Sequence, residues 1–423
     1  MISFDQTSKP TRSLVPWRGV PQETAVSAQM TTSPYSATYL WSATYCRVHS
    51  LALSLLIFLL NMILIFTVFF TTLIVTWILV LTKSWHGHLS FDSTSGVQKF
   101  HTQPTPRIGG IAMLTGLTAA YLFAPVNTRE ILGPMLLAGI PAFAVGLIED
   151  ITKKVRVSTR LFVTMVCGVV GWYITGVAMR NTGIPPLDWL LGFTPVAVLF
   201  TAFAVGGVAN AVNIIDGFNG LAAGVVTIML GAMGLIAFNL NDLPLASVCL
   251  LVAACTLGFG AINWPFGKIF LGDGGAYLLG FLVAWIAVLL PMRNPSITAW
   301  TTLLACAYPV LEVGFSSIRK LKRRGHHPGQ PDKVHLHMLL HRRVARPLCK
   351  NASTALQNGM TSPLVWLYAL LPASWAVLFA QNKTWLMVGL LLSIAVYVVV
   401  YTRLTRFKWP FFTAASRSKS TPT

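Results

Sequence analysis

The chain has 423 residues, of which 54% are hydrophobic and 10% charged, and it carries a formal net charge of +19. Soluble globular proteins have about 25% charged residues, so the composition excludes an ordinary soluble enzyme and indicates an all-α polytopic membrane protein. The basic residues fall in loops between apolar segments, so we do not expect the chain to bind nucleic acid. The six cysteines are isolated or lie in apolar segments, and we expect no disulfide framework.

The two ends of the chain differ from its middle. Residues 1–48 are rich in Ser, Thr and Pro and lack periodicity, so we interpret them as a disordered extension or as translation from a start codon placed too early. Residues 49–403 form one predicted multi-span membrane domain, and residues 404–423 a predicted basic tail in the cytoplasm.

Apolar segments predict about eleven membrane-spanning helices. The first, 51–81, has 31 residues. This exceeds the roughly 20 needed to cross a bilayer, so the segment must tilt or extend beyond the membrane. The others are expected near 109–125, 132–148, 161–179, 189–209, 220–240, 244–263, 275–291, 297–315, 362–380 and 384–402.

Charge assigns the two faces of this predicted domain. The loops alternate between faces, and one set holds 23 of the 31 Lys and Arg residues, so we expect that set in the cytoplasm. Acidic residues are few, and six of the twelve fall on the same face: Asp92, Glu149, Asp150, Asp216, Asp273 and Asp332. A carboxylate at the edge of the hydrocarbon is costly and marks a functional site by default. We expect the four at span edges (Glu149, Asp150, Asp216 and Asp273) to form one site.

The stretch 210–224 reads N-A-V-N-I-I-D-G-F-N-G-L-A-A-G. Its amide and carboxylate side chains recur every three residues, which places them along one drifting face of a helix, and glycines follow where the series ends. Such a helix end suits a cation and a phosphate, although a plain polar helix end with a glycine turn explains the pattern equally well. The residues of the series are Asn210, Asn213, Asp216 and Asn219.

Three further motifs supply charge on the same face. Glu149 and Asp150 precede a basic cluster that ends at Arg160. This arrangement places carboxylates, which bind a metal ion or a proton, beside basic side chains, which attract phosphate. Asp273 lies in F-L-G-D-G-G at the expected start of a helix, where it either binds a ligand or caps the helix. Lys99 and Arg107, in a loop that ends T-P-R-I-G-G, add to the same surface.

Residues 316–346 form the one long loop with several histidines. A zinc site at His335, His337 and His341 is conceivable, but the many neighbouring cations would repel a divalent metal. Positive charge with imidazole donors suits a diphosphate better, and a plain positive-inside loop does not explain Asp332, His335 and His337 together.

These motifs, in this order, resemble those of the polyprenyl-phosphate N-acetylhexosamine-1-phosphate transferases of the glycosyltransferase 4 group. The resemblance covers roughly residues 51–402. It implies that polyprenyl phosphate, such as undecaprenyl phosphate, attacks the β-phosphorus of a UDP-N-acetylhexosamine, releasing UMP and starting a cell-surface polysaccharide. It also implies Mg²⁺ (or Mn²⁺) as cofactor, a multi-pass location in the bacterial inner membrane with a cytoplasmic active site, and contact with membrane lipid. Whether the protein forms a homodimer stays open.

The resemblance also implies roles for individual residues. Asp273 and Asn213 hold the metal, and Asp216 supports it or orients the loop. Glu149 and Asp150 position or deprotonate the lipid phosphate, which Arg160 helps to bind, while Asn219 lies near the uracil and His335 and His337 contact the diphosphate or the sugar.

This chain departs from the family pattern at two positions. Glu149 stands where the family usually has aspartate, and Met338 where it often has histidine. The triple-histidine signature of the peptidoglycan relatives is absent, which favours the polysaccharide-initiating branch. Two other functions stay open: a transporter of anionic sugar or phosphate, and an inactive scaffold of a polysaccharide complex.

Overall fold

The computed structural model describes residues 59–91, 104–322 and 334–406. All of them belong to one of two compact units, residues 59–423, and the other unit, residues 1–58, lies outside the described residues. The predictions for the N-terminal extension and for most of the basic tail therefore also fall outside them.

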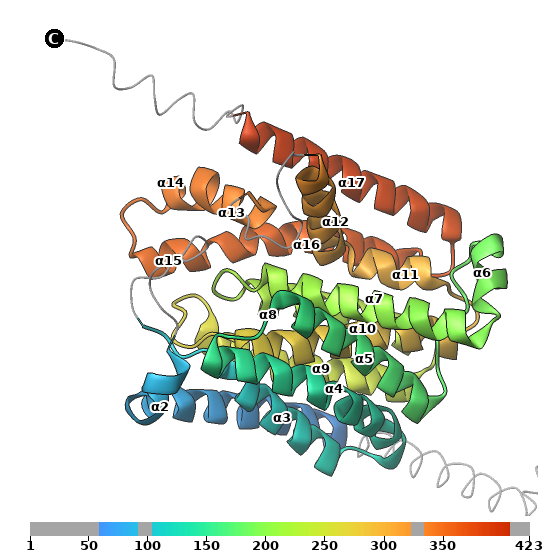
Figure 1. The fold of residues 1–423 in the computed structure, drawn as a ribbon, viewed down its shortest axis with the longest axis horizontal. Helices are drawn as coiled ribbons and strands as arrows, with labels where there is room; N and C mark the ends of the chain where they lie inside the picture. The colour runs from blue at the N-terminus through green and yellow to red at the C-terminus, as the bar shows by residue number, and fades with distance from the viewer. Residues whose placement is uncertain (1–58, 92–103, 323–333, 407–423) are drawn as a thin grey trace, which may run out of the picture. The chain divides into compact units, whose positions relative to one another are not determined.

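The described residues fold into helices without a strand, which confirms the all-α fold class (Figure 1). The first described helix is Leu59–Leu81. The others are α2 (Lys83–Ser90), α3 (Gly109–Phe123), α4 (Val126–Thr152), α5 (Val157–Thr175), α6 (Pro185–Leu191), α7 (Thr194–Ile215), α8 (Leu221–Asn239), α9 (Leu243–Asn263), α10 (Gly272–Arg293), α11 (Ala299–Ala305), α12 (Ala307–Leu321), α13 (Leu336–Leu340), the π-helix η1 (His341–Ala345), α14 (Arg346–Leu348), α15 (Thr354–Gly359), α16 (Thr361–Leu378) and α17 (Lys383–Thr405).

Nine helices in this part of the chain are long and apolar enough to cross a membrane, and the broken pair α11–α12 makes up to ten. Helix α3 is apolar but has 15 residues, about 22 Å of helix against a hydrocarbon core of about 30 Å. Within the described residues, every one of the eleven predicted segments overlaps a helix or the broken pair. Eleven membrane crossings remain a prediction.

The predicted span 297–315 is broken rather than straight. Helices α11 and α12 meet at an angle of 83° around Cys306, and α12 crosses the direction of its neighbours (Figure 1). Pro309 explains the break, because it lacks the N–H that would bond to the Ala305 carbonyl and its ring would clash with that carbonyl. The break turns α12 toward the segment that follows it in the chain.

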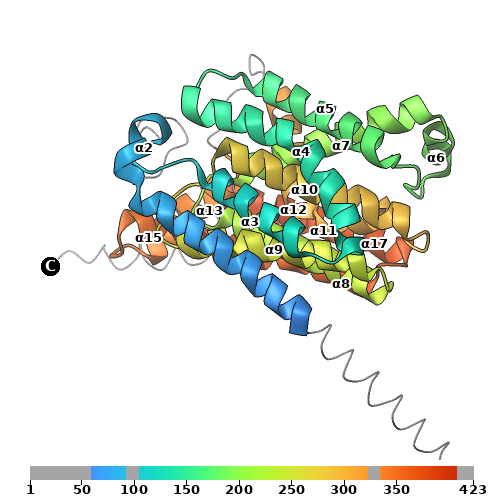
Figure 2. The same cartoon turned by 90° about the horizontal axis from the view of Figure 1, so that it is seen from below.

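Helix α10 is the most buried of the long helices, and it packs against α3, α4 and α7 (Figure 2). Two glycines bring the end of α4 onto the start of α10. A Cβ at Gly146 would lie 2.5 Å from the Asp273 carbonyl oxygen, and Gly272 has φ +74° with the Asp150 carboxylate against it. Only glycine tolerates both the positive φ and the close contact at position 272.

Candidate functional site

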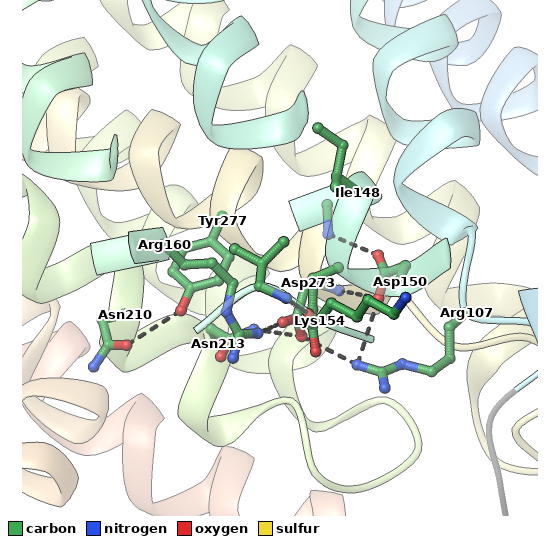
Figure 3. Close-up of polar contacts among 12 residues, drawn as sticks. Arg107, Ile148, Asp150, Lys154, Arg160, Asn210, Asn213, Asp273 and Tyr277 are labelled. Carbon is green, nitrogen blue, oxygen red and sulfur yellow. Dashed lines mark hydrogen bonds and ion pairs between the residues drawn. The ribbon is translucent and has the colours of Figure 1, made fainter. Parts of the chain in front are cut away.

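The start of α10 is capped by a side chain from another helix. Asp150, in the last turn of α4, accepts the Asp273 N–H at Oδ1 (2.8 Å) and the Gly274 N–H at Oδ2 (2.9 Å), as Figure 3 shows. Only 1% of Asp150 is exposed. A carboxylate at a helix N-terminus satisfies free N–H groups and opposes the helix dipole, so Asp150 holds Asp273 in place.

The segment before α3 is held against the same turn. The Phe270 N–H donates to the Pro106 carbonyl (2.8 Å), and the Gly109 N–H donates back to the Phe270 carbonyl (3.0 Å). This pairing places Arg107, between the two, beside the carboxylates of α4 and α10. The T-P-R-I-G-G motif therefore positions Arg107.

Asp273 is the centre of a cluster drawn from five parts of the chain. Its Oδ1 accepts from Arg107 Nη2 (3.1 Å) and from Asn213 Nδ2 (3.1 Å), and its Oδ2 contacts Arg160 Nη1. Arg107 also lies 3.4 Å from Asp150. Two arginines and two carboxylates thus balance each other in a mostly buried setting, where paired charges are tolerated and unpaired ones are costly. The structure brings these five predicted residues together.

Tyr277 joins the cluster to one further predicted residue. It lies one turn beyond Asp273 on α10; Arg160 lies over its ring at 5.8 Å, and its hydroxyl donates to Asn210 Oδ1 (3.3 Å), as seen in Figure 3. Sequence reasoning missed Tyr277, although its i+4 spacing from Asp273 is a signal that could have found it.

The adjacent acids Glu149 and Asp150 separate in the structure. Glu149 Oε2 accepts the Val155 N–H (2.6 Å) and closes the turn after α4, whereas Asp150 points into the cluster. Successive residues on a helix point about 100° apart, so one carboxylate of such a pair turns away. A catalytic role for Glu149 stays a prediction.

Asp216 follows the last residue of α7. Burial raises the pKa of its carboxyl to about 8, with Arg107 lowering the pKa and Asp150 raising it. Asp216 therefore interacts electrostatically with the cluster, and burial favours the protonated form of its carboxyl.

The turn after Asp216 is supported from behind. The Asn219 N–H donates to Asn358 Oδ1 (2.8 Å), and the Asn219 amide donates to the carbonyls of Pro265 (3.0 Å) and Ala355 (3.3 Å). Only 5% of Asn219 is exposed. Its donors stabilise the turn, and its predicted position near the uracil stays a prediction.

Residues 335–341, here called the histidine segment, pack on this turn. The Phe218 ring lies 5.7 Å from His337 and 5.0 Å from His341. A Cβ at Gly217 would lie 3.8 Å from His337 Nε2. The segment therefore lies beside the turn that carries Asp216.

A buried carboxylate that sequence reasoning missed holds the two predicted histidines. Glu312 Oε1 lies 2.8 Å from His335 Nδ1, and its Oε2 lies 3.8 Å from His337 Nδ1. The signal was present, because an acidic residue inside the apolar segment 297–315 marks a functional position by default.

His341 faces away from this carboxylate. Its Nδ1 lies 3.0 Å from Thr361 Oγ1, and burial together with Arg346 lowers its pKa to about 4, so it is neutral at physiological pH. Among the described residues, no three His, Cys, Asp or Glu side chains are grouped to hold a metal. Lys99 and Asp332 lie outside the described residues.

Comparison with known proteins shows that the chain is similar to transferases named for polyprenyl phosphate and N-acetylglucosamine. A model of glycosyl transferase family 4 matches residues 132–291, which include all the predicted site residues on α4, α5, α7 and α10 but neither Arg107 nor the histidine segment. The chain is 29% identical, over 58% of its length and 68% of the relative, to the undecaprenyl-phosphate α-N-acetylglucosaminyl 1-phosphate transferase of Yersinia pestis.

Two further relatives extend the similarity to other bacteria. A probable undecaprenyl-phosphate N-acetylglucosaminyl 1-phosphate transferase of Bacillus subtilis is 25% identical over 73% of this chain and 82% of its own length. A decaprenyl-phosphate N-acetylglucosaminephosphotransferase of Mycobacterium leprae is 31% identical over 58% of this chain and 70% of its own length.

Proposed function

The chain belongs to glycosyl transferase family 4, and from this membership and the site we propose that it transfers an N-acetylhexosamine 1-phosphate from a UDP-sugar to polyprenyl phosphate. UMP leaves, and the lipid-diphosphate-sugar starts a cell-surface polysaccharide. The three relatives are named for N-acetylglucosamine, so we propose that sugar for the donor. The protein is a multi-pass bacterial membrane protein, and we place its site on the cytoplasmic face, because the loops predicted on the same side as the site hold most of the basic residues.

The observation that carries the proposal is the cluster around Asp273. Arg107 and Arg160 both contact this carboxylate at the start of α10. Guanidinium groups bind phosphate with the same forked geometry that they use for carboxylate. Two substrates that each bring phosphate would therefore draw both arginines away from Asp273 and free its oxygens.

The oxygen donors at this site fit magnesium in its partly hydrated form. Mg²⁺ prefers oxygen ligands and is often held by one or two carboxylates, water and substrate phosphates. Asp273 and Asn213 would hold it, with Asp216 in support. The fit requires substrate oxygens, because the described residues contain no group of three His, Cys, Asp or Glu placed to bind a metal alone. When bound, magnesium neutralises charge on the diphosphate.

The reaction mainly requires that the lipid phosphate and the β-phosphorus of the donor are correctly positioned. A phosphate oxygen of the lipid attacks the β-phosphorus of the donor, a P–O bond forms, and the bond to the bridging oxygen breaks as UMP leaves. A phosphate monoester is already largely ionised at pH 7, so the attack needs no protein base. In this account Arg107 and Arg160 hold phosphate oxygens in line, Asp150 fixes Asp273, and the histidine segment contacts the donor.

The proposal is tested by turnover with purified full-length protein in detergent. We expect UMP release from UDP-N-acetylglucosamine only when polyprenyl phosphate and magnesium are both present. A transporter would move the UDP-sugar into vesicles without releasing UMP, and an inactive scaffold would release none. Absence of UMP with every common UDP-N-acetylhexosamine would therefore refute the proposed function.

A further inference from the structure

Glu312 lies on the inner side of the broken helix α12, fully buried, at the point where the histidine segment begins. Its two oxygens accept the Leu336 N–H (3.2 Å each), at the first residue of α13, and Oε1 also pairs with His335 Nδ1. A carboxylate in this place caps α13 and opposes its dipole. Glu312 therefore fixes where the histidine segment starts.

The same carboxylate orients both imidazoles. The rings of His335 and His337 are parallel (interplanar angle 5°, centroids 5.3 Å apart), and both Nδ1 atoms face Glu312. Tyr308, one turn before Glu312 on α12, adds a hydroxyl 3.1 Å from His337 Nδ1. With Nδ1 held toward Glu312, the opposite ring atom, Nε2, points away from Glu312, and that of His337 is buried beside Gly217 in the turn after Asp216.

The contacts around Glu312 offset the cost of burying it. A fully buried carboxylate is costly unless hydrogen bonds or a cation compensate it. Among the described residues, the titratable groups that face Glu312 are His335 and His337 on the histidine segment and three tyrosines from α12, α16 and α17: Tyr308, Tyr368 and Tyr397. The Leu336 N–H and His335 Nδ1 lie within hydrogen-bond distance of its oxygens.

We propose that Glu312 is a positioning residue for the donor diphosphate. It holds His335 and His337 with Nδ1 inward, so that their imidazole rings are placed against the diphosphate beside the 216–220 turn. The inference rests on the proposed function for the identity of the ligand, a nucleoside diphosphate. In this proposal Glu312 does not touch the diphosphate and affects its binding only by orienting the two histidines.

The test compares two probes, UDP and uridine, which differ by the diphosphate alone. Thermal unfolding of the full-length protein is followed in detergent with magnesium and either probe. We expect UDP to stabilise the wild type more than uridine does. In Glu312→Gln the uridine effect should persist, whereas the excess from the diphosphate should fall by an amount equal to about a ten- to hundredfold weaker Kd.

The difference between the two probes is a readout that a general loss of structure would not move. A general loss would weaken the effects of UDP and uridine together, whereas loss of the diphosphate contact weakens only the effect of UDP. Asp242→Asn is the matched control: Asp242 is a buried carboxylate paired with Arg293 (2.7 Å) at the opposite end of α10, and its loss should leave the UDP-minus-uridine difference unchanged.

Two outcomes would overturn the inference: no UDP excess in the wild type, or a full excess in Glu312→Gln. If Glu312→Gln does not purify as folded protein, Glu312→Asp carries the same test, because its shorter arm keeps the charge but withdraws it from the histidines. Turnover measured in parallel separates the two claims. UDP binding that depends on Glu312 without turnover refutes only the proposed function, and turnover with an unchanged donor KM in Glu312→Gln refutes only this inference.

Discussion

At the scale of single residues, the site is a set of opposite charges that satisfy one another. Arg107 and Arg160 neutralise Asp273, and both carboxylate oxygens of Asp150 accept backbone N–H groups at the start of α10. The same arginines are the groups that would bind phosphate, so ligand binding exchanges one set of anions for another. In the proposed function, the carboxylates therefore occupy the arginines until phosphate binds.

Asp273→Asn should reduce kcat/KM by about a hundredfold or more, because it removes the charge to which both arginines and the proposed metal respond. The protein should still purify in normal amount, since asparagine keeps the size of the side chain. The measurement is UMP release at saturating lipid. Glu130→Gln, an exposed carboxylate near the start of α4, is the control that should keep full activity, and comparable activity in both variants would contradict the assignment.

Glu149 and Asp150 should differ sharply when replaced. Asp150→Asn leaves one oxygen for two buried N–H groups, a cost of about 1–3 kcal/mol, and should lower both the unfolding temperature and the activity. Glu149→Gln keeps an acceptor for the Val155 N–H and should keep most of the activity. Equal losses in the two variants would show that the acids act as a pair.

The raised pKa of Asp216 predicts that this group's contribution to stability is lost as pH rises. Burial raises its pKa from 3.8 to about 8, so the folded protein retains a proton that the unfolded chain has lost. Stability from this group is present below about 3.8 and is lost as pH rises toward 8. Without divalent ions, Asp216→Asn should therefore gain unfolding temperature relative to the wild type as pH increases across this range, and a constant difference would contradict the burial of the carboxyl.

At the scale of elements, the site depends on how closely α4 and α10 approach. Gly146 allows this contact, because a Cβ there would lie 2.5 Å from the Asp273 carbonyl oxygen. Helix α12 makes the second necessary contact, since its break at Cys306 carries Glu312 to the histidine segment. Both features concern backbone position rather than chemistry.

Gly146→Ala should destabilise the protein by about 1–3 kcal/mol, because overpacking forces α4 away from α10. Activity should fall with it, as Asp150 leaves the start of α10. Gly231→Ala is the matched control, since a Cβ at this α8 position meets nothing within 4 Å and alanine favours helix. Thermal unfolding and UMP release of the two variants decide the point, and equal behaviour would contradict the close contact.

At the scale of the whole molecule, the sequence predicted the apolar helices well because each segment has its own signal in hydrophobicity. It also predicted that Glu149, Asp150, Asp216 and Asp273 form one site, and the structure joins Asp150 to the start of α10 beside Asp273 but places Glu149 on the turn after α4. It did not predict that Glu149 and Asp150 contact different groups, because this depends on the direction in which each side chain leaves the helix. Nor did it identify Glu312 or Tyr277, whose roles depend on which helices pack together.

The transfer of phosphate from nucleotide to lipid is the central claim, and an isotope on phosphorus tests it most directly. Purified protein is incubated with polyprenyl phosphate, magnesium and UDP-N-acetylglucosamine labelled at the β-phosphorus, and lipid and nucleotide products are then separated. We predict that the label appears in the lipid fraction in equal amount to the UMP released, and that Asp273→Asn abolishes both. Label that remains entirely with nucleotide, or transfer that is unaffected by Asp273→Asn, would contradict the account.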